Sequence, residues 1–266
     1  MLAGKRVKGF LSDVTGVLYD SSHGGGAAIS GSIEAVKRLY AESKVKFLSN
    51  ESTATREKFV RKLEKLGFEL KPDDLITPAP SCAKYIKEHN LRPHLLVYDD
   101  VIPEFDGCDF SNPNCVVVGD AEENFTYENL NKAFRLLHGN PDIPLLSLGT
   151  GKFYQRTDGP CIDVGAFTAA LIYATGCKHI EMGKPSKEYF YNALEALGEK
   201  PEDVVMIGDD IVSDIGGAQK LGMRGIQVRT GKYMKSWENH PEVKPTLIAD
   251  NLFSAVQTVL DSKTTH

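Results

Sequence analysis

The stretch that decides the fold class is DVVMIGDDIVSDIGGAQKLGMRGIQVRTG, residues 203–231. It opens with an apolar, β-branched run of strand length at 203–208, and a second such run follows at 224–228. Residues 213–222, between the two runs, are predicted to form a short helix that ends in glycine. A strand, a helix and another strand in succession predict two parallel strands joined by a helical crossover, and hence an α/β fold.

The same alternation occurs near the amino terminus. RVKGFLSD (6–13) and KVKFLSN (44–50) are predicted strands, and predicted helices follow them at 32–43 and 55–67. Another helix is predicted at 187–198, where a glycine closes it. Both ends of the chain are therefore expected to contribute to one parallel sheet.

Between these two parts lies a segment of about 100 residues with its own alternation of strands and helices. It begins in the proline-rich sequence TPAPS, residues 77–81. We predict a discontinuous Rossmann-like parallel-sheet core made of residues 1–79 and 181–266. Residues 80–180 are predicted to form a second α/β domain inserted into it.

The composition excludes several classes of partner. The chain has 31 Lys and Arg against 36 Asp and Glu, a net charge of −5, and no basic run, which argues against a nucleic-acid partner. Its apolar stretches are too short to span a membrane, and Asp13 interrupts the first of them too early for a signal peptide. Five cysteines without a CxxC pair suit reduced structural thiols. We expect a cytoplasmic protein, and a nuclear location is left open.

Four short motifs each follow a predicted strand of the core. The carboxyl ends of parallel strands meet at one edge of a sheet, where open α/β folds bind ligands. The motif residues are therefore expected to converge on one crevice; they are Asp13, Ser49 with Asn50, Lys184 in MGKPS, and Asp209 with Asp210.

The residue types in these motifs suit phosphoryl transfer. Asp13 and Asp209, with Asp214 behind them, supply the oxygen ligands that Mg²⁺ prefers. Lys184 supplies a positive charge for phosphate oxygens. A carboxylate beside a cation and a metal can attack phosphorus and form an aspartyl phosphate.

Each of these residues also has an ordinary explanation when it is taken alone. Asp13 fits a turn, Lys184 fits a solvated surface, and Ser49 fits the start of a helix. The functional interpretation depends on the occurrence of DVTGV, SN, GKP and GDDIVSD in this order, each after a strand.

In this order the motifs resemble those of haloacid dehalogenase superfamily phosphatases. The superfamily's first motif, Asp-x-Asp-Gly-Thr/Val, is similar to SDVTGVL at Asp13, and its later motifs match Ser49, Lys184 and the acids Asp209 and Asp214. Ser49 and Lys184 are 135 residues apart, a spacing that resembles the subgroup with a large α/β cap of the C2 type. Residues 80–180 would be this cap.

The resemblance implies a set of metal ligands. Asp13 would be both the nucleophile and a ligand of Mg²⁺, residue 15 would give its backbone carbonyl, and Asp209 would complete the protein ligands. Asp214 would lie behind them and orient metal-bound water. For Asp210 either role stays open.

The resemblance also implies how phosphate is held. Ser49 and Asn50 would bind the phosphoryl oxygens, and Lys184 would neutralise the charge of the nucleophile and of the phosphate. Substrates would be phosphorylated small molecules or phosphoproteins, and the family implies a homodimer formed through the cap.

Position 15 departs from the superfamily pattern. Most members have an aspartate there, which acts as general acid and base, whereas Thr15 can do neither at neutral pH. Thr15 therefore predicts substrates whose leaving groups need little protonation: phosphohistidine, phospholysine, imidodiphosphate and inorganic pyrophosphate. Two alternatives stay open, a phosphatase of small-metabolite esters such as phosphoglycolate or pyridoxal phosphate, and a weakly active phosphate-binding regulator.

Overall fold

The computed structural model describes residues 7–21, 25–156 and 159–262. Contacts between residues divide the chain into two compact units. We call Met1–Ser49, Val60–Ile76 and Lys184–His266 the core unit, and Asn50–Phe59 with Thr77–Gly183 the inserted unit.

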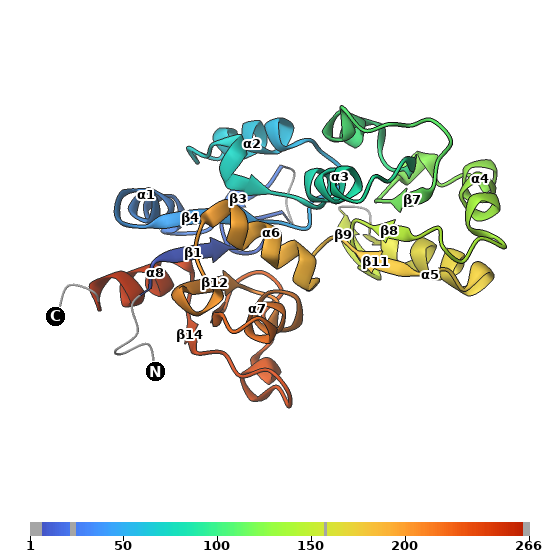
Figure 1. Cartoon of the computed structure of the whole chain (residues 1–266). Helices are drawn as coiled ribbons and strands as arrows, with labels where there is room; N and C mark the ends of the chain where they lie inside the picture. Colours follow the sequence, from blue (N-terminus) through green and yellow to red (C-terminus); the bar gives the residue numbers. More distant parts are fainter. Residues whose placement is uncertain (1–6, 22–24, 157–158, 263–266) are drawn as a thin grey trace. The chain divides into compact units, whose positions relative to one another are not determined.

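The core unit is built on a six-stranded parallel sheet (Figure 1) with the strand order β14-β13-β12-β1-β4-β5. Every residue of β1 and β12 is buried, as expected for central strands that are covered on both faces. The predicted α/β class with a parallel sheet is confirmed. The strands are β1 Gly9–Ser12, β4 Lys44–Leu48, β5 Leu75–Ile76, β12 Val204–Gly208, β13 Arg224–Val228 and β14 Leu247–Ala249.

Five α-helices and a small hairpin accompany this sheet. Helix α6 buries Tyr189, Phe190 and Leu194 in a cluster that also contains Leu11 and Leu48 of the sheet. The helices are α1 Ser32–Glu42, α2 Arg56–Lys65, which both units share, α6 Lys187–Leu197, α7 Gly217–Lys220 and α8 Leu252–Asp261; the hairpin is β2 Tyr19–Asp20 with β3 Ala27–Ala28.

The helix predicted at 213–222 differs in the structure. A π-helical turn, Ile211–Gly216, comes first, and only Gly217–Lys220 is α-helical. Asp210 explains the start of the turn, because its side chain accepts hydrogen bonds from the amides of Val212 and Ser213. Widened turns of this kind often occur at functional sites.

The inserted unit has a second parallel sheet, with the strand order β11-β8-β7-β6. The strands of this sheet are β6 Pro93–Leu96, β7 Cys115–Val118, β8 Leu145–Ser147 and β11 His179–Glu181. The helices of the inserted unit are α3 Pro78–Glu88, α4 Tyr127–Leu137 and α5 Val164–Thr175. Strands β9 Phe153–Arg156 and β10 Gly159–Ile162 pair in an antiparallel hairpin. Across the described ranges of both units, no helix is long and apolar enough to cross a membrane.

Candidate active site

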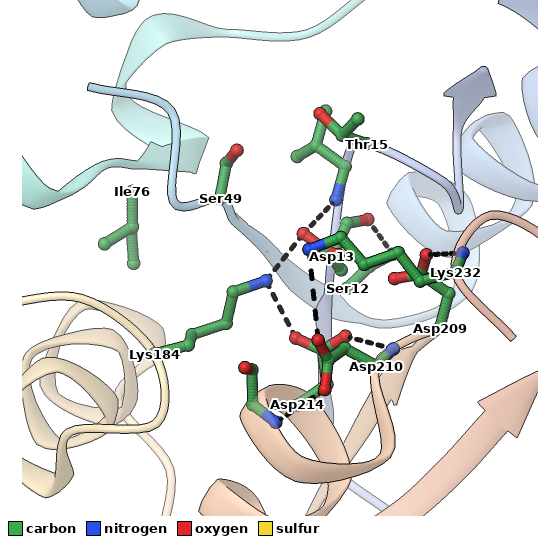
Figure 2. A network of polar contacts seen from close by, with 12 residues as sticks. Ser12, Asp13, Thr15, Ser49, Ile76, Lys184, Asp209, Asp210, Asp214 and Lys232 are labelled. Carbon is green, nitrogen blue, oxygen red and sulfur yellow. Dashed lines mark hydrogen bonds and ion pairs between the residues drawn. The ribbon is translucent and has the colours of Figure 1, made fainter. Parts of the chain in front are cut away.

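The core unit brings five of the predicted site residues to one edge of its sheet (Figure 2). Asp13 directly follows β1, Ser49 follows β4, and Asp209 follows β12. Strands β4 and β12 flank β1 in register, because Ser12 lies opposite both Phe47 and Ile207. Lys184 and Asp214 complete the group.

Three buried carboxylates form the centre of the site. Ligand oxygens of Asp13, Asp209 and Asp214 all lie within 4.8 Å of one another. Oxygen ligands at this spacing are of the kind that a hard divalent cation such as Mg²⁺ prefers. The sequence had placed Asp214 behind the other two, and the structure brings it into the same cluster.

Lys184 is the cation of this cluster, and its side chain is 4% exposed. Its Nζ lies 2.6 Å from Oδ1 of Asp13 and 2.8 Å from Oδ1 of Asp214. Burial lowers the pKa of Lys184, but the charges of the two aspartates outweigh burial and raise the pKa above its usual value. Lys184 therefore stays protonated at neutral pH.

One lysine does not balance three carboxylates. Burial, followed by the charges of Asp13 and Asp214, raises the pKa of Asp209. Burial and the charge of Asp13 likewise raise the pKa of Asp214, against the opposing effect of Lys184. A divalent cation would supply the missing positive charge, so the donor set and the charge both fit a metal ion.

Asp209 and Asp214 are held by different hydrogen-bond partners. Oδ2 of Asp209 accepts the amide hydrogen of Lys232 at 2.6 Å. Asp214 uses Oδ1 for Lys184, and its Oδ2 accepts the amide hydrogen of Asp210 at 3.1 Å. With both oxygens occupied, Asp214 is better suited to hold Lys184 than to bind a metal directly.

Two glycines make room for Asp209. Gly16 has φ +86°, and a Cβ added there would lie 2.2 Å from Oδ2 of Asp209. Gly231 has φ +58°, and a Cβ there would lie 2.0 Å from the same oxygen. Both positions therefore require glycine, for backbone conformation and for space.

Asp210 has a structural role. Its side chain caps the turn at Ile211–Gly216 and lies outside the group of three carboxylates. A role for Asp210 as a metal ligand, or in orienting metal-bound water, stays a prediction.

Thr15 contributes a hydroxyl where an acid–base pair would need a second carboxylate. The hydroxyl of Thr15 donates to the hydroxyl of Tyr19 at 3.3 Å, and Nζ of Lys62 donates to the same oxygen at 3.2 Å. The Lys62 ammonium also lies 4.8 Å from the centroid of the Tyr19 ring. Sequence reasoning missed Tyr19 and Lys62, since neither stands in a recognisable motif.

Ser49 is buried, and its backbone is fixed on both sides. Its amide donates to the carbonyl of Ile76 at 3.0 Å, and its own carbonyl accepts from the hydroxyl of Tyr189. Asn50 belongs to the inserted unit. Its function as a phosphoryl ligand stays a prediction.

Comparisons with known proteins agree with this fold. Residues 10–111 match a family model described as haloacid dehalogenase-like hydrolase, and residues 181–255 match a second model, described as HAD-hydrolase-like. The chain belongs to the haloacid dehalogenase-like hydrolase family, as its motifs predicted.

Particular members of the family are similar over almost the whole chain. The human phospholysine phosphohistidine inorganic pyrophosphate phosphatase is 51% identical over 261 residues, which cover 97% of each chain. The protein of the same name from Danio rerio is 50% identical over 260 residues, covering 97% of this chain and 96% of that one. Among solved structures, 4-nitrophenylphosphatase from Thermotoga maritima has a TM-score of 0.84 at 26% identity, with 95% of this chain and 97% of that chain covered.

Proposed function

We propose that this protein is a Mg²⁺-dependent phosphatase that hydrolyses the P–N bonds of phosphohistidine, phospholysine and imidodiphosphate, and inorganic pyrophosphate. One observation carries the proposal: Lys184 joins Asp13 to a buried carboxylate cluster, while position 15 holds a hydroxyl instead of a carboxylate. The names of the relatives at about 50% identity support the same activity.

Asp13 is the nucleophile in this proposal. One of its carboxylate oxygens bonds to phosphorus while the bond from phosphorus to the leaving group breaks, which gives an aspartyl phosphate and the free amine, imidazole, phosphoramidate or phosphate. A water oxygen then bonds to phosphorus, the bond to Asp13 breaks, and inorganic phosphate leaves. The amide of Val14 and Nζ of Lys184 both donate to Oδ1 of Asp13 and so fix the direction of attack.

The other residues act on charge and position. Lys184 and the hydroxyl of Ser49 hold the phosphoryl oxygens. Mg²⁺, held by Asp13, Asp209 and the backbone carbonyl of Thr15, would neutralise charge on the phosphoryl group.

Thr15 selects the bond that is broken. An alkyl alcohol leaves poorly unless an acid protonates it, and no carboxylate stands at position 15 to do so. A phosphohistidine releases an imidazole whose pKa is about 6.5, so it needs little help. Phospholysine nitrogen is basic enough to take its own proton, and phosphate leaves pyrophosphate readily.

Thr15→Asp is expected to shift specificity toward alkyl phosphate esters. An acid at this position typically contributes about 10²–10⁴-fold, so the ratio of ester to P–N turnover should rise by at least about tenfold. Steady-state rates on an alkyl phosphate and on imidodiphosphate measure the ratio, and Thr15→Ser is the matched control that keeps a hydroxyl. An unchanged ratio in Thr15→Asp would contradict the role given to Thr15.

Metal binding is expected to depend on pH. The pKa of Asp209 is raised from 3.8 to about 8 and that of Asp214 to about 7, so the metal-free folded protein binds more protons than the unfolded chain within this window. Its free energy of unfolding should therefore fall as the pH rises from about 4 to about 8. Mg²⁺ binds the ionised carboxylates, so its stabilising effect should be small at the acid end and largest near pH 8.

Thermal denaturation in excess EDTA and in excess Mg²⁺, across this pH range, measures both effects. Asp209→Asn should weaken the pH dependence in EDTA and remove most of the stabilisation by Mg²⁺. Stability in EDTA that does not change with pH would contradict the proposed coupling of the three carboxylates.

A homodimer is proposed, with helix α5 as part of its interface. Val164–Thr175 contains no charged residue, yet Ala169, Ala170 and Tyr173 are exposed, and the Tyr173 side chain is 95% exposed. A helix that is apolar on all sides is usually covered.

The predicted cytoplasmic location, with a nuclear one left open, stays a prediction.

Tyr173→Glu is expected to convert a dimer into a monomer, because it places a charge on the exposed apolar surface of helix α5. Light scattering coupled to size exclusion gives the mass, and Tyr191→Glu, on helix α6 of the core unit, is the control that should stay dimeric. A monomeric parent protein, or a dimeric Tyr173→Glu, would exclude this interface.

A further inference from the structure

Tyr189 contacts the backbone beside the site residue Ser49. It lies on α6, is 1% exposed, and packs among the apolar side chains between α6 and the sheet. Its hydroxyl donates to the carbonyl of Ser49 at 2.5 Å and to the carbonyl of Ile76 at 2.9 Å. One phenol thus joins two backbone carbonyls that come from different strands.

These two carbonyls belong to residues at the boundary of the core unit. Ser49 and Ile76 are the residues after which the chain leaves the core unit, at the carboxyl ends of β4 and β5. The ladder between these two strands ends with the pair Leu48 and Ile76, and the amide of Ser49 just beyond it still donates to the carbonyl of Ile76. Buried peptide groups need hydrogen bonds, and the Tyr189 hydroxyl shares its one hydrogen between the carbonyls of Ser49 and Ile76.

The result is that the peptide groups on both sides of Ser49 are held. The amide of Ser49 donates to the carbonyl of Ile76, and the carbonyl of Ser49 accepts from Tyr189. The direction of the Ser49 side chain follows from the orientation of these two peptide groups. Loss of the hydroxyl would remove one of the hydrogen bonds that orient the peptide between Ser49 and Asn50, and with it part of the alignment of the Ser49 hydroxyl.

We infer that Tyr189 is a positioning residue for phosphoryl transfer, whose hydroxyl aligns Ser49 with a phosphoryl oxygen. The inference rests on the proposed function, which gives Ser49 its task. A displacement of about 1 Å in a catalytic group can cost about 10²-fold in rate, so loss of one phenolic oxygen remote from the reacting atoms has a large expected effect.

Tyr189→Phe removes only this oxygen and keeps the ring. We expect kcat to fall by about 10-fold to 10²-fold, and the inhibition constant for inorganic phosphate to rise in parallel. Tyr40→Phe is the matched control, since the Tyr40 hydroxyl donates to a side chain, Oδ2 of Asp74, at 3.0 Å. This control should change kcat by less than about twofold.

A double-mutant cycle with Ser49→Ala decides whether Tyr189 acts through Ser49. If it does, Tyr189→Phe will have no further effect on kcat or on phosphate inhibition once Ser49 is alanine. Losses of kcat that add in the double variant would overturn the inference and leave the proposed function intact. A normal kcat in Tyr189→Phe beside an impaired Ser49→Ala would have the same consequence. A Ser49→Ala variant with unchanged kinetics would overturn both the inference and the task that the proposed function gives to Ser49.

p-Aminophenylalanine at position 189 supplies a rescue, and it also covers the case in which Tyr189→Phe does not fold. Its amine has two hydrogens and can donate to both carbonyls. We expect it to restore kcat to within about threefold of the parent protein. A folded p-aminophenylalanine variant that is as impaired as Tyr189→Phe would overturn the inference.

Discussion

Asparagine in place of Asp13 will reduce Mg²⁺-dependent turnover of imidodiphosphate and pyrophosphate by about 10⁴-fold or more. Removal of a nucleophile costs far more than removal of a supporting group, because no other residue can form the covalent intermediate. The amide has the size of the carboxylate and can still accept from Val14 and Lys184, so the fold should persist. Steady-state kinetics with both substrates measure the loss, and circular dichroism checks the fold.

The matched control for Asp13→Asn is Asp203→Asn. Asp203 stands immediately before β12, at the amino end of the strand that Asp209 follows, and it pairs with Lys8. This change should leave turnover within about twofold of the parent rate. Substantial activity in Asp13→Asn would exclude Asp13 as the nucleophile.

Methionine in place of Lys184 will lower both stability and activity. Lys184 is buried against two carboxylates, and removal of one partner from a buried ion pair typically costs about 3–5 kcal/mol in the free energy of unfolding. Activity should fall by about 10²–10³-fold, since the charge that neutralises the nucleophile and the phosphate is lost. Denaturant unfolding near pH 7 and steady-state kinetics measure the two effects.

The pH dependence of this loss has a definite sign. The raised pKa of Lys184 means that its charge is present throughout the range below its usual 10.5, and its stabilising effect is lost only at higher pH. The penalty in Lys184→Met should therefore be largest where Asp209 and Asp214 are ionised, and it should shrink as the pH falls and these two carboxylates, whose pKa values are raised, take up protons. Lys46→Met is the matched control, because Lys46 pairs with Asp74 in a more exposed position. An equal penalty at acid and neutral pH would contradict the assigned charge compensation.

Much of the fold could be predicted from local sequence. The apolar run of β12 and the mostly apolar β1 indicate strands covered on both faces, and the alternation with helices indicates their parallel order. The π-helical turn at Ile211–Gly216 could not be predicted, because it depends on how Asp210 caps the turn and on how the following glycines pack. Periodicity carries no signal for such a turn.

The motifs predicted which residues form the candidate site, but they did not predict the pKa values of those residues. The order of strands brings Asp13 and Asp209 together, which follows from the rule that parallel strands end at one edge. The expectation that Lys184 also follows a core strand was wrong, because the strand before it, β11, belongs to the sheet of the inserted unit. The raised pKa values of Asp209 and Asp214 depend on burial and on distances across the sheet, which no spacing in the sequence gives. The contacts of Tyr189 with two backbone carbonyls are likewise invisible until the chain is folded.

The central claim is that this enzyme cleaves bonds whose leaving groups need no strong acid. Its most direct test is the relative kcat/KM of phosphohistidine, phospholysine, imidodiphosphate, pyrophosphate and an alkyl phosphate, each with Mg²⁺ and with EDTA. We predict that the P–N substrates and pyrophosphate exceed the alkyl phosphate by at least about 10²-fold, and that all turnover requires Mg²⁺. An alkyl phosphate that is hydrolysed as fast as the P–N substrates and pyrophosphate would contradict the claim.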